Sequence, residues 1–302
     1  MDYRKRLEEF KPSKDYLVCI DSDGCAFDTM GIKQRECFCP WMIAYFGLQL
    51  VAQAARECKE FADLYSKTRG ANRHVTIKRI LSELLPNHPQ TKAFGFQVPQ
   101  FSHYFAWVDD PKSLLSNDGL KRAIAATDDP RAKEELSHVL EWAERVNWAV
   151  KEIVKGIPPF PHVRESLELM RDKADMVVVS ATPLEEALER EWVEHGIASY
   201  TALICGQEMG TKKEQIAAVG PHYPEGHVLM IGDAPGDMRA AKANAALFYP
   251  IIPGDEIAAW KLFYEEGIER FLAGTYAGEY EKMLIERFER ALPERPPWEV
   301  NR

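Results

Sequence analysis

Two acidic residues, Asp21 and Asp23, come at the end of an apolar run and are separated by a single residue. The run, residues 16–20, is short and continuous, which predicts a fully buried β-strand. Open parallel sheets carry their reactive groups at the carboxyl ends of the strands, where these two carboxylates would lie. Alternate residues of an extended chain point the same way, so the carboxylates would repel each other. Such a pair is stable if a cation neutralises it or if one member keeps its proton, and both arrangements support catalysis.

Polar residues also follow two other apolar runs and open one predicted helix. In chain order they are Ser180 after residues 176–179, Lys212 and Lys213 at a helix start, and Asp233 and Asp237 after residues 228–231. Phosphoryl transfer needs a nucleophile, a proton donor for the leaving group and positive charge around the phosphoryl oxygens. The residue types at these four places match those needs.

The elements that would position these groups alternate along the chain. Strands are predicted at residues 16–20, 176–179, 202–205, 228–231 and 246–249. Helices are predicted at residues 165–171, 184–195, 213–219 and 238–245. Alternation of strands and helices predicts an α/β fold with a doubly wound, parallel, Rossmann-like sheet.

A region of different character separates the first strand from the second. It has almost no strand signal, and helices are predicted at residues 35–46, 75–85, 114–126 and 131–154. We therefore expect an α-helical cap domain at residues 30–156, inserted into an α/β core at residues 1–29 and 157–302 whose last part, 251–302, is a helical tail. An insertion after the first strand would cover Asp21 and Asp23, where a lid belongs.

Composition excludes several classes of partner. The 302 residues include 38 basic and 47 acidic side chains, and the formal net charge of −9 disfavours nucleic acid and anionic membranes as partners. No apolar stretch approaches the ~18 residues of a membrane span. The charged N-terminus does not resemble a signal peptide, so we expect a cytoplasmic protein. The six cysteines form no CxxC pair, which disfavours a zinc knuckle.

Taken in order, the four polar elements resemble the motifs of the haloacid dehalogenase-like (HAD) hydrolase superfamily. The resemblance covers residues 14–29 and 157–250, and the helical insertion corresponds to the cap that this family carries between its first and second motifs. It implies an enzyme that forms an aspartyl-phosphate on Asp21, with Asp23 as general acid and base. Ser180 would donate a hydrogen bond to the phosphoryl group. Lys212, or alternatively Lys213, would neutralise its charge.

The resemblance also implies a Mg²⁺ cofactor. Its ligands would be Asp21, the backbone carbonyl of Asp23, Asp233, and Asp237 either directly or through water. Asp237 could equally be a helix N-cap. Dehalogenating and phosphonate-cleaving members of the family lack an acid at the position of Asp23, because their leaving groups have no oxygen to protonate. We therefore expect a phosphatase acting on a small phosphorylated metabolite.

Two other functions stay open at this stage. A phosphomutase would use the same residues and return the phosphoryl group to its substrate. A phospho-accepting signalling protein, as in receiver domains, would combine similar groups without turnover.

Substrate recognition and oligomeric state depend on less specific signals. Arg69, Asn72 and Arg73 surround a glycine turn before a helix, and arginine forks suit phosphate or carboxylate recognition. The alternative is a solvated basic turn. The tail carries a series of aromatic residues that predicts a core face or a subunit contact, which leaves a homodimer open.

Overall fold

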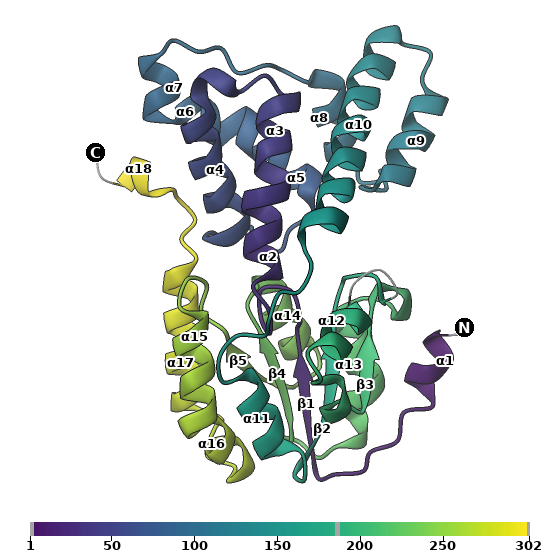
Figure 1. Cartoon of the computed structure of the whole chain (residues 1–302), viewed down its shortest axis with the longest axis vertical. Helices are drawn as coiled ribbons and strands as arrows, with labels where there is room; N and C mark the ends of the chain where they lie inside the picture. The colour runs from purple at the N-terminus through teal and green to yellow at the C-terminus, as the bar shows by residue number, and fades with distance from the viewer. Residues whose placement is uncertain (1–2, 185–187, 301–302) are drawn as a thin grey trace. The chain divides into compact units, whose positions relative to one another are not determined.

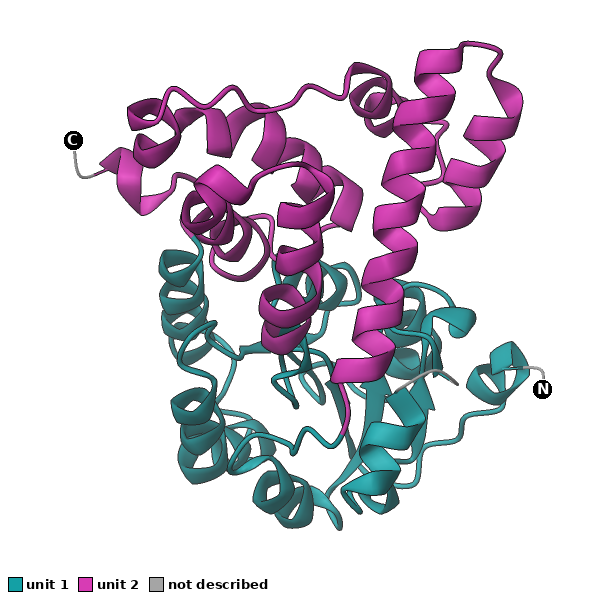
Figure 2. Cartoon of the chain, turned by 45° about the horizontal axis from the view of Figure 1, so that its top comes forward, with its two compact units in different colours: residues 1–30, 156–292 teal, residues 31–155, 293–302 magenta. Residues whose placement is uncertain are grey.

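The computed structural model describes residues 3–184 and 188–300, and the chain divides into two compact units (Figure 2). The first unit contains residues 1–30 and 156–292, and the second contains residues 31–155 and 293–302. The inner boundaries lie within one residue of those expected for a core and an inserted domain. The last ten residues group with the second unit, whereas we expected the whole tail to belong to the first.

The C-terminal segment joins the second unit through Trp298. The ring centroid of Trp298 lies 4.8 Å from that of His88 and 5.8 Å from that of Phe61. Arg79 also donates a hydrogen bond of 3.1 Å to the carbonyl of Glu294. These contacts between residues far apart in the sequence explain why local patterns did not predict the grouping.

The first unit is built on a five-stranded parallel sheet with the order β3-β2-β1-β4-β5 (Figure 1). The strands are β1 (Tyr16–Ile20), β2 (Ala174–Val179), β3 (Leu203–Cys205), β4 (Val228–Gly232) and β5 (Leu247–Pro250). All pairings are parallel, which confirms the predicted α/β fold class. Because β1 pairs with a strand on either side and its residues after Tyr16 are buried, its sequence is a continuous apolar run.

Helices connect consecutive strands of this sheet. The helices of the first unit are α1 (Tyr3–Glu8), α11 (Val163–Met170), α12 (Glu189–Glu194), α13 (Lys212–Val219), α14 (Pro235–Ala243), α15 (Glu256–Leu262), α16 (Ile268–Leu272) and α17 (Glu279–Ala291). From β1 to β3 the chain adds strands in one direction along the sheet, and it then returns to add β4 and β5 on the other side of β1. Right-handed crossovers therefore place α11 and α12 on one face of the sheet and α13 and α14 on the other. The predicted helix at residues 184–195 is present from Glu189, and its residues 185–187 lie outside the described residues.

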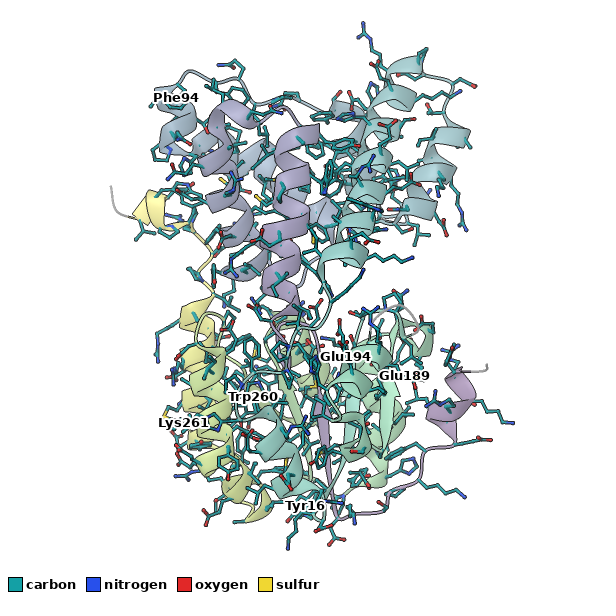
Figure 3. The ribbon with its side chains drawn as sticks, in the orientation of Figure 1. Tyr16, Phe94, Glu189, Glu194, Trp260 and Lys261 are labelled. Atoms are coloured by element: carbon teal, nitrogen blue, oxygen red, sulfur yellow. The ribbon has the colours of Figure 1, made fainter. Side chains whose placement is uncertain are left out.

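Most aromatic residues of the tail belong to the core of the first unit, whereas Tyr264 is exposed and Trp298 packs in the second unit. Trp260, Phe263, Phe271, Tyr276 and Phe288 are buried in one hydrophobic cluster with the sheet. The prediction of a structural role for this aromatic series is therefore confirmed. Figure 3 shows the consequence on α15, where Trp260 points inward while its exposed neighbour Lys261 points outward.

The second unit is helical. Its helices are α3 (Cys39–Tyr45), α4 (Ala52–Leu64), α5 (Arg73–Arg79), α6 (Leu85–Asn87), α7 (Pro89–Ala93), α8 (Ser102–Asp109), α9 (Asn117–Ala126), α10 (Pro130–Ile153) and α18 (Pro297–Val300), and α2 (Thr29–Ile32) crosses the boundary between the units. Helix α4 was not predicted, because its buried face includes the ion pair of Lys59 and Asp63, whose Nζ and Oδ2 atoms are 2.6 Å apart. Within residues 3–184 and 188–300, no helix is both long and apolar enough to cross a membrane.

Asp175 fastens the N-terminal segment to the start of β2. Its carboxylate accepts hydrogen bonds from Ser13 N (2.7 Å), Ser13 Oγ (2.6 Å), Lys14 N (3.0 Å) and the hydroxyl of Tyr223 (2.6 Å). Burial raises the pKa of Asp175, but the hydrogen bonds from Ser13, Tyr223 and Lys14 outweigh burial and lower it. The carboxylate therefore stabilises the fold in its charged form.

We predict that Asp175→Ala lowers the free energy of unfolding by about 1.5–3 kcal/mol, because several donors lose a charged acceptor. Ser13→Ala, the matched control, removes one side-chain donor and should cost only about 0.5–1.5 kcal/mol. Urea unfolding at neutral pH measures both. Since folding lowers the pKa of Asp175, the difference between wild type and Asp175→Ala should shrink as the pH falls below the ordinary range of an aspartate. Equal midpoints for the two variants at neutral pH would contradict this assignment.

Candidate active site

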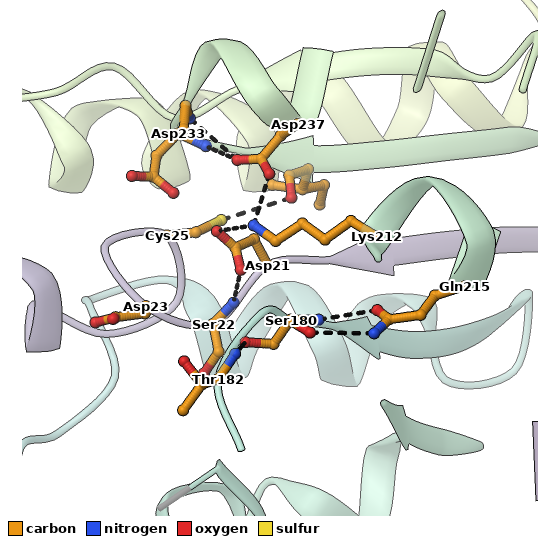
Figure 4. A network of polar contacts seen from close by, with 12 residues as sticks. Asp21, Ser22, Asp23, Cys25, Ser180, Thr182, Lys212, Gln215, Asp233 and Asp237 are labelled. Carbon is orange, nitrogen blue, oxygen red and sulfur yellow. Dashed lines mark hydrogen bonds and ion pairs between the residues drawn. The ribbon is translucent and has the colours of Figure 1, made fainter. Parts of the chain in front are cut away.

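Three carboxylates meet at the carboxyl end of the sheet. Asp21 follows β1, Asp233 follows β4 and Asp237 lies in the first turn of α14. All three are buried, and each offers an oxygen atom within 4.8 Å of the others (Figure 4). The sequence prediction that the carboxyl ends of these strands carry one acidic site agrees with this geometry.

The sheet order explains why these two strands supply the acids. The order reverses between β1 and β4, and ligands of open α/β sheets bind in the crevice at such a reversal. The backbone of Asp21 extends the pairing, since Asp21 N donates a hydrogen bond of 3.0 Å to Ile231 O. Asp21 and the residues after β4 are thus held in register by the sheet itself.

Asp237 caps its own helix while it faces the site. Its Oδ2 atom accepts hydrogen bonds from Asp233 N (3.1 Å) and Ala234 N (3.0 Å). These are backbone groups at the start of α14, where a carboxylate is favoured. A Cβ atom at position 232 would overlap the side chain of Asp237, so the close approach requires the glycine found there.

Lys212 links two of the acids. Its Nζ atom lies 2.7 Å from Asp21 Oδ2 and 2.6 Å from Asp237 Oδ1. Lys213 is exposed, so the structure places the first lysine of the pair, and not the second, in the site. Burial lowers the pKa of Lys212, but the charges of Asp21 and Asp237 outweigh burial and raise the pKa above its usual range. The two carboxylates therefore favour the charged form of this side chain.

The carboxylates of this cluster influence one another's charge state. Asp21, Asp233 and Asp237 lie together, and Lys212 contacts the first and the last of them. Burial raises the pKa of Asp21 well above its usual range. Lys212 opposes this rise, and the charges of Asp237 and Asp233 add to it. A divalent cation that prefers oxygen ligands fits this donor set and would restore the ionised form of Asp21.

Asp23 lies outside this cluster of carboxylates. The chain leaves the extended conformation after β1 and enters a turn in which Gly24 has a φ of +85°. The expectation that Asp21 and Asp23 point the same way is therefore wrong, because it assumed that the strand continues. In Figure 4 the side chain of Asp23 lies apart from the three acids, and the hydroxyl of Thr29 donates a hydrogen bond to its Oδ1 atom.

Ser180 directly follows β2, the neighbour of β1 on the other side. Its hydroxyl oxygen accepts a hydrogen bond of 3.1 Å from Thr182 N, and its backbone is bound by the amide of Gln215 (Figure 4). Gln215 was not identified from the sequence as a site residue. Its presence in the first turn of the helix that begins with Lys212 was the available signal.

Two tryptophans hold the turn that follows Asp21. The indole N–H of Trp192 donates to Ser22 Oγ (3.0 Å), and that of Trp260 donates to the carbonyl of Cys25 (2.8 Å). No local pattern links either tryptophan to this turn. Burial raises the pKa of the Cys25 thiol, and the charges of Asp233 and Asp21 raise it further, so Cys25 is a neutral packing residue.

The three residues predicted to bind substrate have structural partners within the second unit. Arg69 is buried and donates to Leu64 O (2.9 Å). Asn72 caps α5 by accepting from His74 N (2.9 Å) and donates to Leu115 O (2.9 Å). Arg73 donates to Asn147 Oδ1 (2.7 Å) and lies over the ring of Phe38. Contact with a substrate stays a prediction for all three.

Comparison with known proteins gives matches to solved structures alone. No family model matches the sequence, and the search of curated proteins finds no significant match. A structure provisionally named a phosphoglycolate phosphatase, from Lactobacillus delbrueckii subsp. bulgaricus, is 16% identical with a TM-score of 0.47, and the match covers 79% of this chain and 87% of that one.

Two further structures match over more of this chain. A haloacid dehalogenase-like hydrolase from Xanthomonas campestris is 12% identical with a TM-score of 0.44, covering 88% of this chain and 95% of that one. A structure provisionally named a beta-phosphoglucomutase, from Bacteroides vulgatus, is 14% identical with a TM-score of 0.45, covering 92% and 97%. Matches this distant carry no information about the activity of this chain, which has to be inferred from its own residues.

We predict that Mg²⁺ at about a hundred times its Kd raises the free energy of unfolding by about 2.7 kcal/mol, because the ion binds the folded site alone. Asp233→Asn should remove most of this gain, since it deletes a charged ligand. Asp23→Asn is the matched control and should keep the gain, because the Asp23 carboxylate lies outside the cluster and the backbone carbonyl is unchanged. Thermal unfolding with and without Mg²⁺ measures each response. An Asp233→Asn protein that responds like wild type would exclude this metal site.

Proposed function

We propose that this protein is a Mg²⁺-dependent phosphatase that hydrolyses a small phosphomonoester through an aspartyl-phosphate on Asp21. The observation that carries the proposal is the contact of Lys212 with both Asp21 and Asp237 inside a buried cluster of three carboxylates. Such a site combines a carboxylate nucleophile with fixed positive charge, as phosphoryl transfer requires. Asp21, Asp233 and Asp237 would hold the Mg²⁺ ion, which when bound supplies charge neutralisation for the nucleophile and the phosphoryl oxygens.

In the first step the carboxylate of Asp21 forms a bond to phosphorus, and the bond from phosphorus to the leaving oxygen breaks. Asp23 gives its proton to that oxygen, so the product departs as an alcohol. The hydrogen bond from Thr29 orients the Asp23 carboxyl group during this transfer. Lys212 and the hydroxyl of Ser180 stabilise charge on the transferring group.

In the second step a water molecule attacks the phosphorus of phospho-Asp21 and gives a proton to Asp23. Phosphate leaves, the Asp21 carboxylate is restored, and Asp23 is again protonated for the next cycle. Each proton that Asp23 donates in the first step is thus returned in the second.

Experiments can distinguish the two alternative functions, phosphomutase and phospho-accepting signalling protein, from this proposal. A phosphomutase would depend on a trace of bisphosphorylated substrate and would release no phosphate. A phospho-accepting signalling protein would stop after the first step and accumulate phospho-Asp21. The presence of Asp23 favours a second step, because the attacking water needs a base.

We predict Mg²⁺-dependent release of phosphate from p-nitrophenyl phosphate and from members of a panel of phosphorylated metabolites. Asp21→Asn should lower kcat by about 10³-fold or more, since the amide cannot form the covalent intermediate. Lys213→Ala, which changes the exposed neighbour of Lys212, serves as the matched control and should retain wild-type activity. Absence of turnover by the folded, Mg²⁺-loaded wild type on the whole panel would overturn the proposed function.

The role of Asp23 makes a separate prediction for Asp23→Asn. p-Nitrophenolate leaves without being protonated, so the first step should survive and give a burst of about one equivalent of product followed by slow turnover. An alkyl phosphate needs the proton, and should give no burst. Stopped-flow absorbance and quenched phosphate assays measure the two cases. A variant that turns over both substrates steadily at the wild-type rate would remove Asp23 from the mechanism.

A further inference from the structure

One buried amide connects the two elements that carry Ser180 and Lys212. Gln215 has 0% of its surface exposed. Its Oε1 atom accepts from Ser180 N (3.1 Å), and the two N–H groups of its Nε2 atom are shared among the carbonyls of Ser180 (3.1 Å), Gly206 (2.9 Å) and Gly210 (3.0 Å). A single side chain therefore binds the end of β2 and both ends of the loop that precedes α13.

We propose that Gln215 is a positioning residue that fixes the hydroxyl of Ser180 relative to the ammonium group of Lys212. This inference rests on the proposed function, in which both groups contact the transferring phosphoryl group. Gln215 itself touches neither the acids of the site nor the reacting atoms in this scheme. It acts through the backbone of Ser180.

The helix that carries Gln215 is held rigidly at its start. Lys212 and Gln215 are three residues apart in α13, so they lie on adjacent turns of one helical surface. Thr211 and Glu214 form a capping box, in which Thr211 N donates to Glu214 Oε2 (2.7 Å) and Glu214 N donates to Thr211 Oγ1 (3.3 Å). The side chains of Gln215 and Lys212 therefore start from the same capped helix turn.

The other end of the connection is the hydroxyl of Ser180. Its oxygen accepts a hydrogen bond from Thr182 N, which leaves its own hydrogen to be donated to a phosphoryl oxygen. Ser180 N also donates to Cys205 O (3.0 Å), so this N–H keeps a partner if Gln215 is changed. The carbonyls of Ser180, Gly206 and Gly210 would lose their contacts with Nε2, so this side chain would no longer join Ser180 to the loop before α13.

An apolar variant of the same length tests the role. Gln215→Met removes all four hydrogen bonds and keeps the volume. Tyr276→Phe is the control: it removes one fully buried hydrogen bond, from the Tyr276 hydroxyl to Phe248 O, elsewhere in the same unit. We expect Gln215→Met to lower kcat by about 10–100-fold, as a displacement near 1 Å at a reacting group does, and Tyr276→Phe to leave kcat unchanged.

Ligand affinities separate positioning from general damage. Gln215→Met should weaken binding of orthovanadate, a phosphoryl mimic, by about tenfold, while the Kd of Mg²⁺ changes by less than about threefold, because the three acids keep their places. Thermal shift titrations of the full chain with each ligand measure both. A folded Gln215→Met protein with wild-type kcat and orthovanadate affinity overturns the inference, and so does equal weakening of both ligands.

Two further results complete the test. Gln215→Glu keeps the acceptor for Ser180 N but loses the donors, and it should show the same split if Gln215→Met does not fold. Failure of both variants to fold assigns Gln215 to the core and rejects the positioning role. If wild type binds orthovanadate without turning over any phosphomonoester, the proposed function is wrong. The effects of Gln215→Met on the orthovanadate and Mg²⁺ affinities still test the role of Gln215 in that case. If wild type neither binds nor turns over, both proposals fall.

Discussion

The site depends on one electrostatic arrangement, in which the ammonium group of Lys212 lies between the buried carboxylates of Asp21 and Asp237. Burying a carboxylate is costly unless its charge is compensated. Burial raises the pKa of Asp21 well above its usual range; Lys212 opposes this rise, and the charges of Asp237 and Asp233 add to it. A bound divalent cation would favour the ionised form of Asp21, so in the proposed function metal binding and activation of the nucleophile would be coupled.

The parallel sheet holds the groups of this arrangement in place. Reversal of the strand order between β1 and β4 opens a crevice where Asp21 and Asp233 follow paired strands. Backbone N–H groups at the start of α14 bind Asp237, and Gly232 leaves room for it. Groups fixed by strands and helix starts need little rearrangement during the reaction, which is how preorganised sites stabilise charge.

Local sequence patterns predicted elements whose buried residues are all apolar, and they missed elements that bury charged residues. The strand β1 was predicted with its observed bounds, because a strand buried on both faces is an unbroken apolar run. Helix α4 was missed, because Lys59 and Asp63 lie on its buried face and neutralise each other there. The place of the last ten residues was also missed, since it depends on Trp298 meeting residues more than 200 positions earlier.

The order of the acidic, hydroxyl and basic residues after successive strands was enough to indicate phosphoryl-transfer chemistry, because parallel strands bring their carboxyl ends to one edge. Which of two adjacent lysines enters the site was decided only by the tertiary structure, since a helix turns neighbouring side chains in different directions. The turn at Gly24 similarly separated Asp23 from the carboxylates, against the alternation of an extended strand. The supporting contacts of Gln215, Trp192 and Trp260 join segments distant in sequence, and no local pattern can encode them.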